Sequence, residues 1–278
     1  MTDFYTENNI LRCAALDIPG IVHGFSTRNG GVSVNAHTKS LNLGYGRGDD
    51  DLTVDENRRI FASLVGYDCA NLVTAEQTHS ARVVYADGSV NVYEDCDGFV
   101  TDVPGVFIAV KTADCQPIIF ADPCARVVGV CHAGWRGTVN KIAANTVDAM
   151  VRLGANRKTT VAALGPCIGK CCFEVKDDFI EAVRGADKEL LSFIGSYHAD
   201  IRAMNEYVLI RAGILKENIY VCRDCTCCMA EKYYSHRRQK GLRGTMLSGI
   251  GMKNDTAVQR GSFRAKAKDD RVRRIGVF

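Results

Sequence analysis

The chain has 278 residues, of which 46% are hydrophobic, and its formal net charge is +3 at pH 7. This length allows one large domain or two small ones with a sizeable core, and the composition excludes a largely disordered chain. Residues 1–9 lack the basic and apolar regions of a signal peptide, and no run reaches the roughly 20 apolar residues that span a bilayer. We therefore predict a cytoplasmic protein without a membrane partner.

The charge is concentrated at the C-terminal end. Residues 253–278 contain eight Lys and Arg against three Asp, a net +5 that leaves −2 for the rest of the chain. A near-neutral body differs from nucleic-acid binders, which interleave basic and aromatic residues along a groove, so we expect no nucleic-acid partner. We predict a catalytic domain over residues 1–252 and a solvated, partly disordered basic extension over residues 253–278, with an anion or RNA contact of the extension as the alternative.

The first strong helix signal is the capping box Thr53-Val-Asp-Glu56, a pattern that satisfies the free N–H groups of a helix N-terminus. Apolar residues then recur at helical spacing: Ile60, Phe61, Leu64 and Val65. Four runs rich in apolar and β-branched residues follow, over 71–79, 81–87, 106–112 and 126–131. The pattern predicts a helix packed on a sheet and then consecutive strands.

A second helix is predicted over residues 138–153, because one stripe of it is apolar and Gly154 provides a stop. The segment His132–Gly137 is then a strand-to-helix turn. Further elements are expected over residues 160–164 (strand), 177–184 and 200–213 (helices), and 218–222 (strand). Strands and helices mix without a linker or a repeat, so we predict a single globular α/β (α+β) domain with mixed β-sheets flanked by helices.

Three chemically active side chains lie at ends of predicted strands: His79, Cys115 and His132. Their separations along the chain are too long for a zinc knuckle, so the fold itself would have to assemble them. One thiolate and two imidazoles suit Zn²⁺, and three protein ligands leave a fourth position for water or substrate, as catalytic zinc requires. The sequence predicts one zinc ion per chain here, although each of the three residues taken singly is more often a hydrogen-bonded or structural core residue.

Two glycine-containing segments indicate anion contacts. In His132–Gly137 two glycines allow a close approach of the backbone to a ligand, and Arg136 would clamp a phosphate or form a salt bridge. The segment Ser26–Ser33 carries Arg28 in a glycine loop, which either binds an anion or only turns the chain.

The cysteine content is high, with 13 residues, and the odd number argues against complete disulfide pairing. Close-spaced sets occur at Cys167 with Cys171-Cys172 and at Cys222-Arg-Asp-Cys225 with Cys227-Cys228. A zinc knuckle usually needs turn glycines and a matching partner pair, and Cys222 ends an apolar strand. We therefore expect these cysteines to be mostly reduced and unliganded, with a second metal site as the alternative.

Other chemistries for the same residues remain open. Cys115 activated by His132 or His79 would give a metal-free thiol hydrolase or deamidase. A copper-dependent polyphenol oxidase would need a blue-copper centre plus further histidine-rich clusters, and six histidines in the whole chain are too few for both. A non-enzymatic module stabilised by zinc would unfold on chelation, and the open coordination position argues against it.

A series of motifs resembles the YfiH-like family of purine nucleoside phosphorylases, formerly called multicopper polyphenol oxidase or laccase-domain proteins. The matching segments are Gly24–Ser33, Ser40–Gly44, Asn57-Arg58, Gln77–His79, Asp97-Gly98, Thr112–Cys115, His132–Gly137, Gly165–Gly169 and Tyr234–Arg238. The resemblance covers roughly residues 20 to 250. The chain departs from it at Ser235-His-Arg-Arg238, where the family has Ser-Tyr-Arg-Arg, and at Leu242–Thr245, where it has Thr-Gly-Arg.

The resemblance implies phosphorolysis of adenosine, inosine and methylthioadenosine to free base and ribose 1-phosphate, with adenosine deamination as a second activity. It also implies that His79, Cys115 and His132 match the zinc positions of the family. For the phosphate co-substrate we predict Arg28, Arg58 and Arg136 as ligands, because guanidinium groups bind phosphate with two hydrogen bonds. Asp114 would orient a ligand or transfer a proton. We expect a monomer or a homodimer.

Overall fold

The structure is a computed structural model, and it describes residues 3–254 of the chain. The predicted basic extension over residues 253–278 lies outside the described residues except for Lys253 and Asn254. Within the described range no helix is long and apolar enough to cross a membrane. The cytoplasmic location stays a prediction.

Two large mixed β-sheets form the centre of the fold. The first has seven strands in the order β1 (Phe4–Glu7), β2 (Ile10–Cys13), β3 (Ile21–Ser26), β15 (Met246–Met252), β8 (Phe107–Thr112), β4 (Leu72–Glu76) and β6 (Val92–Glu94). The second has six strands in the order β14 (Ile219–Val221), β11 (Val161–Leu164), β9 (Gln116–Asp122), β10 (Val127–Ala133), β7 (Gly98–Thr101) and β5 (Val83–Tyr85). Each sheet contains both parallel and antiparallel pairs, which confirms the prediction of mixed sheets.

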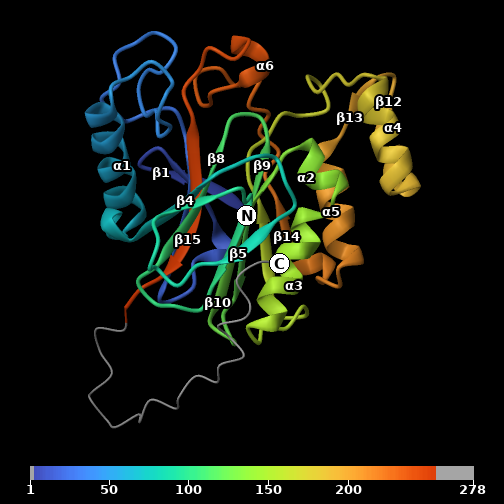
Figure 1. Ribbon diagram of the computed structural model, residues 1–278, viewed down its shortest axis with the longest axis horizontal. Coiled ribbons are helices and arrows are strands. Elements are labelled where there is room, and N and C mark those ends of the chain that lie inside the picture. The colour runs from blue at the N-terminus through green and yellow to red at the C-terminus, as the bar shows by residue number, and fades with distance from the viewer. Residues whose placement is uncertain (1–2, 255–278) are drawn as a thin grey trace.

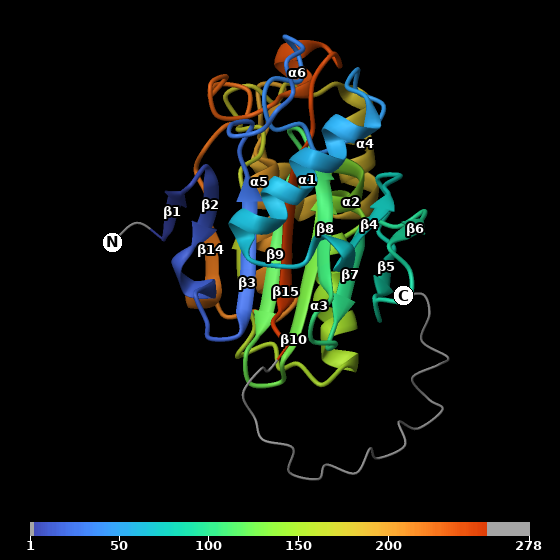
Figure 2. The same ribbon diagram turned by 90° about the vertical axis from the view of Figure 1, so that its left-hand side faces the viewer.

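The two sheets pack face to face, and helices cover their outer faces (Figures 1 and 2). These helices are α1 (Asp51–Val65), α2 (Trp135–Val139), α3 (Ile142–Arg152), α4 (Asp177–Ala186) and α5 (Ile201–Arg211). The short helix α6 (His236–Gln239) lies instead at one end of the sandwich. Short 3-10 turns span Ala14–Leu16, Cys69–Asn71, Lys188–Phe193 and Lys216–Asn218, and β12 (Ile194–Gly195) pairs with β13 (His198–Ala199). The single α/β domain predicted from the sequence is confirmed.

Three apolar layers hold this arrangement together. Between the sheets, side chains such as Phe25 and Ile108 of the first sheet meet Ile119 and Val130 of the second. A second layer lies between the six-stranded sheet and the helices α3, α4 and α5, and a third lies under α1. Because the six-stranded sheet is covered on both faces, its central strands β9 and β10 are buried at every position and mostly apolar rather than alternating.

The N-terminus of α1 differs from the prediction. The helix begins at Asp51, and the cap is Asp50, whose carboxylate accepts the backbone N–H of Thr53 at 2.8 Å and its hydroxyl at 2.9 Å. The capping box assigned to Thr53 is therefore wrong: Asp50 supplies the oxygen one turn earlier, and Thr53 lies inside the first turn. Gly66, in the left-handed conformation, ends the helix.

The predicted helix over residues 138–153 is divided in two. A short α2 starts directly after the turn at Trp135, and Lys141 with φ 62° then redirects the chain into α3. Most other predicted elements occur within a few residues of their expected positions, as β4, β5, β8, β10, β11, β14, α4 and α5. Strand β15 was not predicted because Gly249 and Gly251 weaken its strand pattern. A Cβ at Gly249 would come within 2.6 Å of the Ile108 carbonyl oxygen, so the close neighbouring strand needs glycine there.

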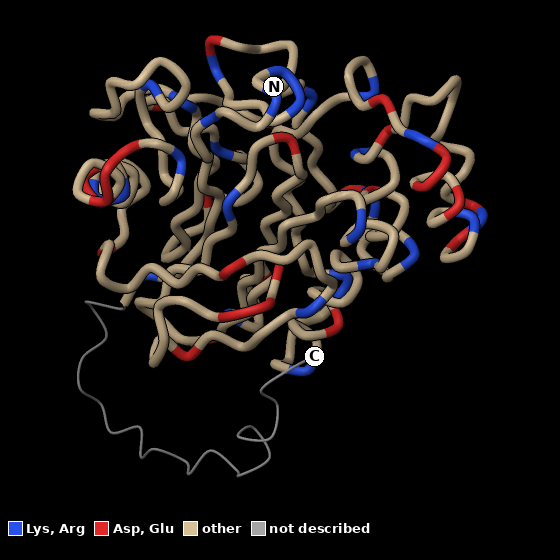
Figure 3. The backbone as a smooth tube through the Cα atoms, turned by 45° about the horizontal axis from the view of Figure 1, so that its top comes forward, with Lys and Arg blue, Asp and Glu red and all other residues tan. Residues whose placement is uncertain are grey.

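The outer helices carry charges of both signs, as Figure 3 shows for α1 and α4. Some of these charges pair within one helix, such as Arg59 with Glu56 and Arg184 with Glu181. This mixture agrees with the near-neutral body expected from the sequence.

Candidate functional site

A cavity of about 590 Å³ opens at the end of the sandwich near α6. Its walls come from the loops that follow β4, β8 and β10, from α2, and from the segments 44–47, 168–173 and 236–245. Both sheets therefore contribute to it. The lining includes His79, Cys115 and His132 together with Asp114 and Arg136.

The three predicted metal donors converge in this cavity. The metal-binding atoms of His79, Cys115 and His132 lie within 4.8 Å of one another, and Cys115 Sγ is 3.9 Å from His79 Nε2. The imidazole rings of His79 and His132 meet edge to face at a centroid distance of 4.9 Å. His132 belongs to β10 and is buried, whereas His79 lies in an exposed turn after β4. Three segments that are distant in the sequence thus place two nitrogens and one sulfur around a common point.

Asp97 positions both imidazoles. Its fully buried carboxylate accepts a hydrogen bond from His132 Nδ1 at 2.7 Å and the backbone N–H groups of Thr78, His79 and Ser80 at 2.8–3.1 Å. Burial opposes ionisation, but the hydrogen bonds from His132 and Ser80 lower the pKa of Asp97, so its carboxylate is ionised and only accepts. The carboxylate therefore fixes a proton on His132 Nδ1, which leaves Nε2 as the ring nitrogen available to a metal.

Gly134 leaves room at the centre of the donor group. A Cβ built on Gly134 would lie 2.9 Å from His79 Cδ2, 3.1 Å from Cys115 Sγ and 3.5 Å from His132 Cε1. Its φ of −65° is open to any residue, so space and not backbone conformation accounts for the glycine. The strand-to-helix turn predicted at His132–Gly137 is thus present, with Gly134 at the position before α2.

The electrostatics favour a thiolate at Cys115. Burial raises the pKa of the thiol, but the imidazoles of His132 and His79 outweigh this effect and lower the pKa to about 6. Burial also opposes protonation of His132, yet the negative charges of Cys115 and Asp97 raise its pKa. A thiolate between two imidazoles is a donor set that fits zinc in type, number and spacing.

Asp114 lines the cavity, but its carboxylate is engaged by the neighbouring loops. Oδ1 accepts the Thr226 hydroxyl at 2.6 Å, and Oδ2 accepts the Ser235 hydroxyl at 3.0 Å and the Arg237 N–H at 2.7 Å. Asp114 therefore fixes α6 against the loop that carries Cys115. Both carboxylate oxygens of Asp114 therefore accept hydrogen bonds from the protein itself.

The three arginines predicted to bind phosphate lie in different environments. Arg136 lines the cavity, where its guanidinium lies 4.1 Å from the centroid of Trp135. Arg28 is not among the lining residues; its guanidinium donates to the backbone carbonyls of Lys39 and Ala230. Arg58 also lies outside the lining and is buried, with Nε donating to the Leu43 carbonyl. The structure thus brings only Arg136 of the three together with the donor group.

Other cationic side chains of the lining were not singled out from the sequence: Arg47, Lys111, Arg237 and Arg243. Arg243 is the most informative, because its Nε is buried and has no hydrogen-bond partner in the described part of the chain. Burial, followed by repulsion from Arg47, lowers the pKa of Arg243 to about 10. The guanidinium of Arg243 is half-buried, and its Nη1 donates to the Gly244 carbonyl and the Thr245 hydroxyl. Two guanidinium groups close together form an environment that an anion would stabilise.

Residues 22–253 match the family model described as multi-copper polyphenol oxidoreductase laccase. The chain belongs to this YfiH-like family. The resemblance inferred from the motifs is thereby confirmed.

Two relatives and one solved structure illustrate the membership. The chain is 38% identical over 244 residues to adenosine deaminase RL5 of an unknown prokaryotic organism, covering 82% of this chain and 93% of the relative. It is 36% identical over 265 residues to purine nucleoside phosphorylase YlmD of Geobacillus stearothermophilus, covering 88% and 95%. The crystal structure of the hypothetical protein YfiH of Bacillus licheniformis, 34% identical, superposes with a TM-score of 0.85 over 91% of this chain and 100% of that one.

The family description mentions several coppers, but the histidines of this chain are dispersed. His79 and His132 belong to the donor group, and His236 lines the same cavity. His23 is buried in β3 and its Nε2 accepts the N–H of Cys13, while the remaining two lie elsewhere in the described residues. A blue-copper centre with additional histidine-rich clusters would need more imidazoles than these.

Proposed function

We propose that the protein is a zinc-dependent purine nucleoside phosphorylase that also deaminates adenosine. In this proposal adenosine, inosine or methylthioadenosine reacts with inorganic phosphate to give free base and ribose 1-phosphate. The observation that carries it is the joint occurrence, in one cavity, of an open three-donor group and a pair of neighbouring arginines, Arg47 and Arg243. The names of the relatives, purine nucleoside phosphorylase and adenosine deaminase, support both activities.

We assign the metal to His79, Cys115 and His132, with Asp97 holding the two imidazoles in place. A zinc ion bound there would supply Lewis acidity, the property by which zinc sites activate water near neutral pH. Three protein ligands leave a coordination position open, which a structural site does not need.

We assign the phosphate to the cationic wall of the cavity. The guanidinium of Arg243 would donate to the anion from the cavity wall, and the nearby charge of Arg47 would add to the attraction. Arg136 stays a candidate ligand because it lines the same cavity. Arg28 and Arg58, whose guanidinium groups donate to backbone carbonyls, would act by holding loops in place.

Aromatic and apolar side chains give the cavity a surface for a purine base. Trp135 and Phe173 line it together with Ile168 and Ile201. Trp135 is held by an edge contact with Phe179 at 5.4 Å, so its ring has a fixed orientation. A planar base packed on such rings would place its sugar between the donor group and the cationic wall.

The test measures zinc content and product formation in the same preparations. Free base and ribose 1-phosphate are assayed from adenosine and inosine with and without phosphate, in the wild type and in Cys115→Ala. We expect phosphate-dependent release of base in the wild type, and loss of both zinc and turnover in the variant. Release of base that does not depend on phosphate would contradict the proposal.

Arg243→Ala separates the two activities. A lost hydrogen bond from a charged donor costs about 1.5–3 kcal/mol, so the KM for phosphate should rise by roughly 10- to 100-fold, while deamination changes little. The variants Arg28→Ala and Arg58→Ala serve as comparators, because the sequence pattern alone gives them the same role. If either raises the KM for phosphate more than Arg243→Ala does, our assignment of the anion site is wrong.

A second candidate is a metal-free thiol hydrolase or deamidase. It is favoured by one observation: Cys115, His132 and Asp97 form a thiol–imidazole–carboxylate series, with His132 Nδ1 bonded to Asp97 at 2.7 Å. A zinc-free active preparation that loses activity on stoichiometric alkylation of Cys115 would establish this function and refute the zinc proposal.

We propose that residues 1–252 form the catalytic domain and that a monomer or homodimer binds only the small-molecule nucleoside and phosphate.

A further inference from the structure

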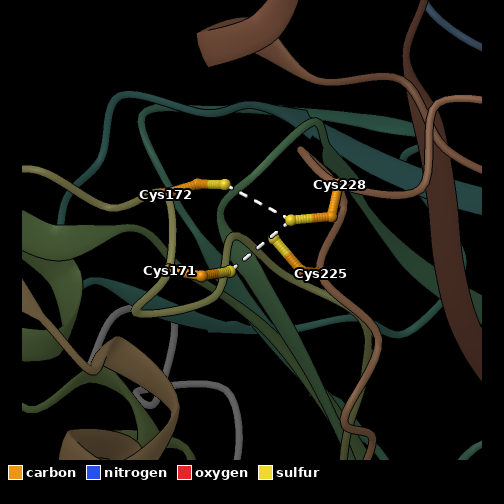
Figure 4. A group of neighbouring side chains, drawn as sticks. All are labelled: Cys171, Cys172, Cys225 and Cys228. Atoms are coloured by element: carbon orange, nitrogen blue, oxygen red, sulfur yellow. Dashed lines mark hydrogen bonds between the residues drawn. The ribbon is translucent and has the colours of Figure 1, made fainter.

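Four cysteines outside the cavity converge on one point: Cys171, Cys172, Cys225 and Cys228, here called the four-cysteine cluster. Their Sγ atoms all lie within 4.8 Å of one another, and Figure 4 shows the side chains directed toward one another from two loops. Cys228 Sγ is 3.6 Å from Cys171 Sγ and 3.4 Å from Cys172 Sγ, and all four cysteines are free. We propose that the four-cysteine cluster binds one zinc ion as a structural site, separate from the site of His79, Cys115 and His132.

The size of the cluster fits a tetrathiolate site. Zinc–sulfur bonds of about 2.3 Å in a tetrahedron place the sulfurs roughly 3.8 Å apart. This value lies between the Cys172–Cys228 sulfur distance of 3.4 Å and the 4.8 Å within which all four sulfurs lie. Cys225 and Cys228, the first and last residues of Cys225-Thr-Cys-Cys228, have knuckle spacing, and the adjacent pair Cys171-Cys172 faces them from the other loop. Four protein ligands close the coordination sphere, which is typical of structural rather than catalytic zinc.

The backbone around the cluster is arranged for a thiolate. The N–H of Gly169 donates to Cys225 Sγ at 3.1 Å, a contact that offsets negative charge on sulfur. A Cβ at Gly169 would lie 3.2 Å from Cys171 Sγ and 3.3 Å from Cys225 Cβ, so the glycine allows the two loops to approach closely. The sequence pattern alone did not show that Gly169 and the pair Cys171-Cys172 face Cys225 and Cys228.

The convergence argues against unliganded cysteines and against two disulfides. Cys228 has two sulfur neighbours at similar distances, so the sulfurs form one group and not two pairs. Cys167 and Cys222, which belonged to the predicted sets, are buried and lie outside the cluster. The knuckle is therefore Cys225–Cys228 and not Cys222–Cys225.

A metal at this position would join two loops that build one wall of the cavity. The first loop carries Ile168 and Phe173, which line the cavity. The second carries Thr226, whose hydroxyl donates to Asp114 next to Cys115. The four-cysteine cluster would thus hold the cavity wall without contributing an atom to the reaction.

The first experiment uses the wild-type chain, purified under reducing conditions, and follows alkylation of individual cysteines by mass spectrometry. Cys171, Cys228 and Cys124 are all exposed. With zinc bound, Cys171 and Cys228 should resist alkylation until a chelator is added, whereas Cys124 reacts at once. Equal alkylation rates of the three cysteines before chelation would overturn the proposal. So would a denatured, unreduced chain with four free thiols fewer than its 13 cysteines, because that result would indicate two disulfides.

The second experiment counts zinc by elemental analysis. Cys225→Ser combined with Cys228→Ser should bind one zinc per chain fewer than the wild type, while the control Cys124→Ser retains the full amount. Cobalt substitution should give the intense thiolate-to-cobalt absorption of a tetrathiolate site in the wild type and in Cys115→Ala, but not in the double variant. Unchanged zinc in the double variant, or an iron–thiolate spectrum in the protein as isolated, would refute the zinc assignment. Neither readout depends on turnover, so the outcome is independent of the nucleoside assay.

Discussion

The substitution Asp97→Asn tests how the donor group is held. The carboxylate of Asp97 accepts five hydrogen bonds, from His132 Nδ1, from the N–H groups of Thr78, His79 and Ser80, and from the Ser80 hydroxyl. An amide keeps only one accepting oxygen, so its NH₂ group must face at least two of these donors. If it faces His132, the ring has to move its proton to Nε2 and loses the lone pair that would bind a metal.

The expected magnitude follows from these contacts. Two or three lost hydrogen bonds to a buried charge, at roughly 1–3 kcal/mol each, should lower the free energy of unfolding by about 3–5 kcal/mol. Zinc affinity should fall by about 10- to 100-fold, the usual effect of removing a carboxylate that orients a histidine ligand.

Urea denaturation and competition with a chelator measure the two effects of Asp97→Asn. Asp95→Asn is the matched control, because Asp95 is exposed, accepts only the Thr78 hydroxyl and forms an ion pair with Arg82 at 3.7 Å. It should cost less than about 1 kcal/mol. An Asp97→Asn variant with the unfolding midpoint and zinc affinity of the wild type would refute our reasoning.

Three further predictions address the site, a helix terminus and pH. Gly134→Ala places a methyl group 2.9 Å from His79 Cδ2 and should abolish zinc binding while the fold persists; Gly185→Ala, which meets nothing within 4 Å, should leave zinc binding unchanged. Asp50→Ala removes the α1 cap and should lower the free energy of unfolding by about 1 kcal/mol in urea denaturation, a result that an unaltered midpoint would contradict. Burial lowers the pKa of His23 from 6.5 to about 4, so the unfolded chain binds the proton more readily, and stability should fall by about 2 kcal/mol from about pH 7 to about pH 5. His23→Gln should remove this component of the pH dependence, and an identical pH profile in the variant would exclude His23 as its source.

The sequence could single out the three proposed metal donors because their chemistry is local. Histidine and cysteine at strand ends in glycine-rich turns are readable from the motif, and the strand ends do place His79, Cys115 and His132 around one point. The role of Asp97 was not readable, because its five donors come from a turn and a strand that only the fold brings together. The cationic wall was missed for the same reason.

The arginines show most clearly which features of the site cannot be predicted from local sequence. Arg28 lies in a glycine loop that resembles an anion site. Its guanidinium nevertheless donates to the backbone carbonyl of Ala230, which is 202 residues away in the sequence. Arg243 has no motif to distinguish it, and only the fold shows that it lines the cavity beside Arg47. A guanidinium takes whichever acceptor the tertiary structure offers, and local sequence does not encode that choice.

Elements were predicted correctly where an apolar pattern coincides with a stop signal. They were predicted wrongly where backbone geometry determines whether an element continues or ends. The division of the predicted helix depends on the left-handed conformation of Lys141, a residue without a propensity for it. Strand β15 contains two glycines that pattern analysis reads as breaks, whereas the neighbouring β8 makes them necessary.

The three metal donors belong to both halves of the sandwich. His79 follows a strand of the seven-stranded sheet, His132 is in the six-stranded sheet, and Cys115 lies where the chain crosses from β8 to β9. The thickness of the apolar layer between the sheets therefore sets the spacing of the donors. Core substitutions in this layer are therefore expected to alter turnover although they lie far from the cavity. Equally large substitutions beneath α1 should alter only stability. The two layers thus differ in how freely their residues can vary during evolution.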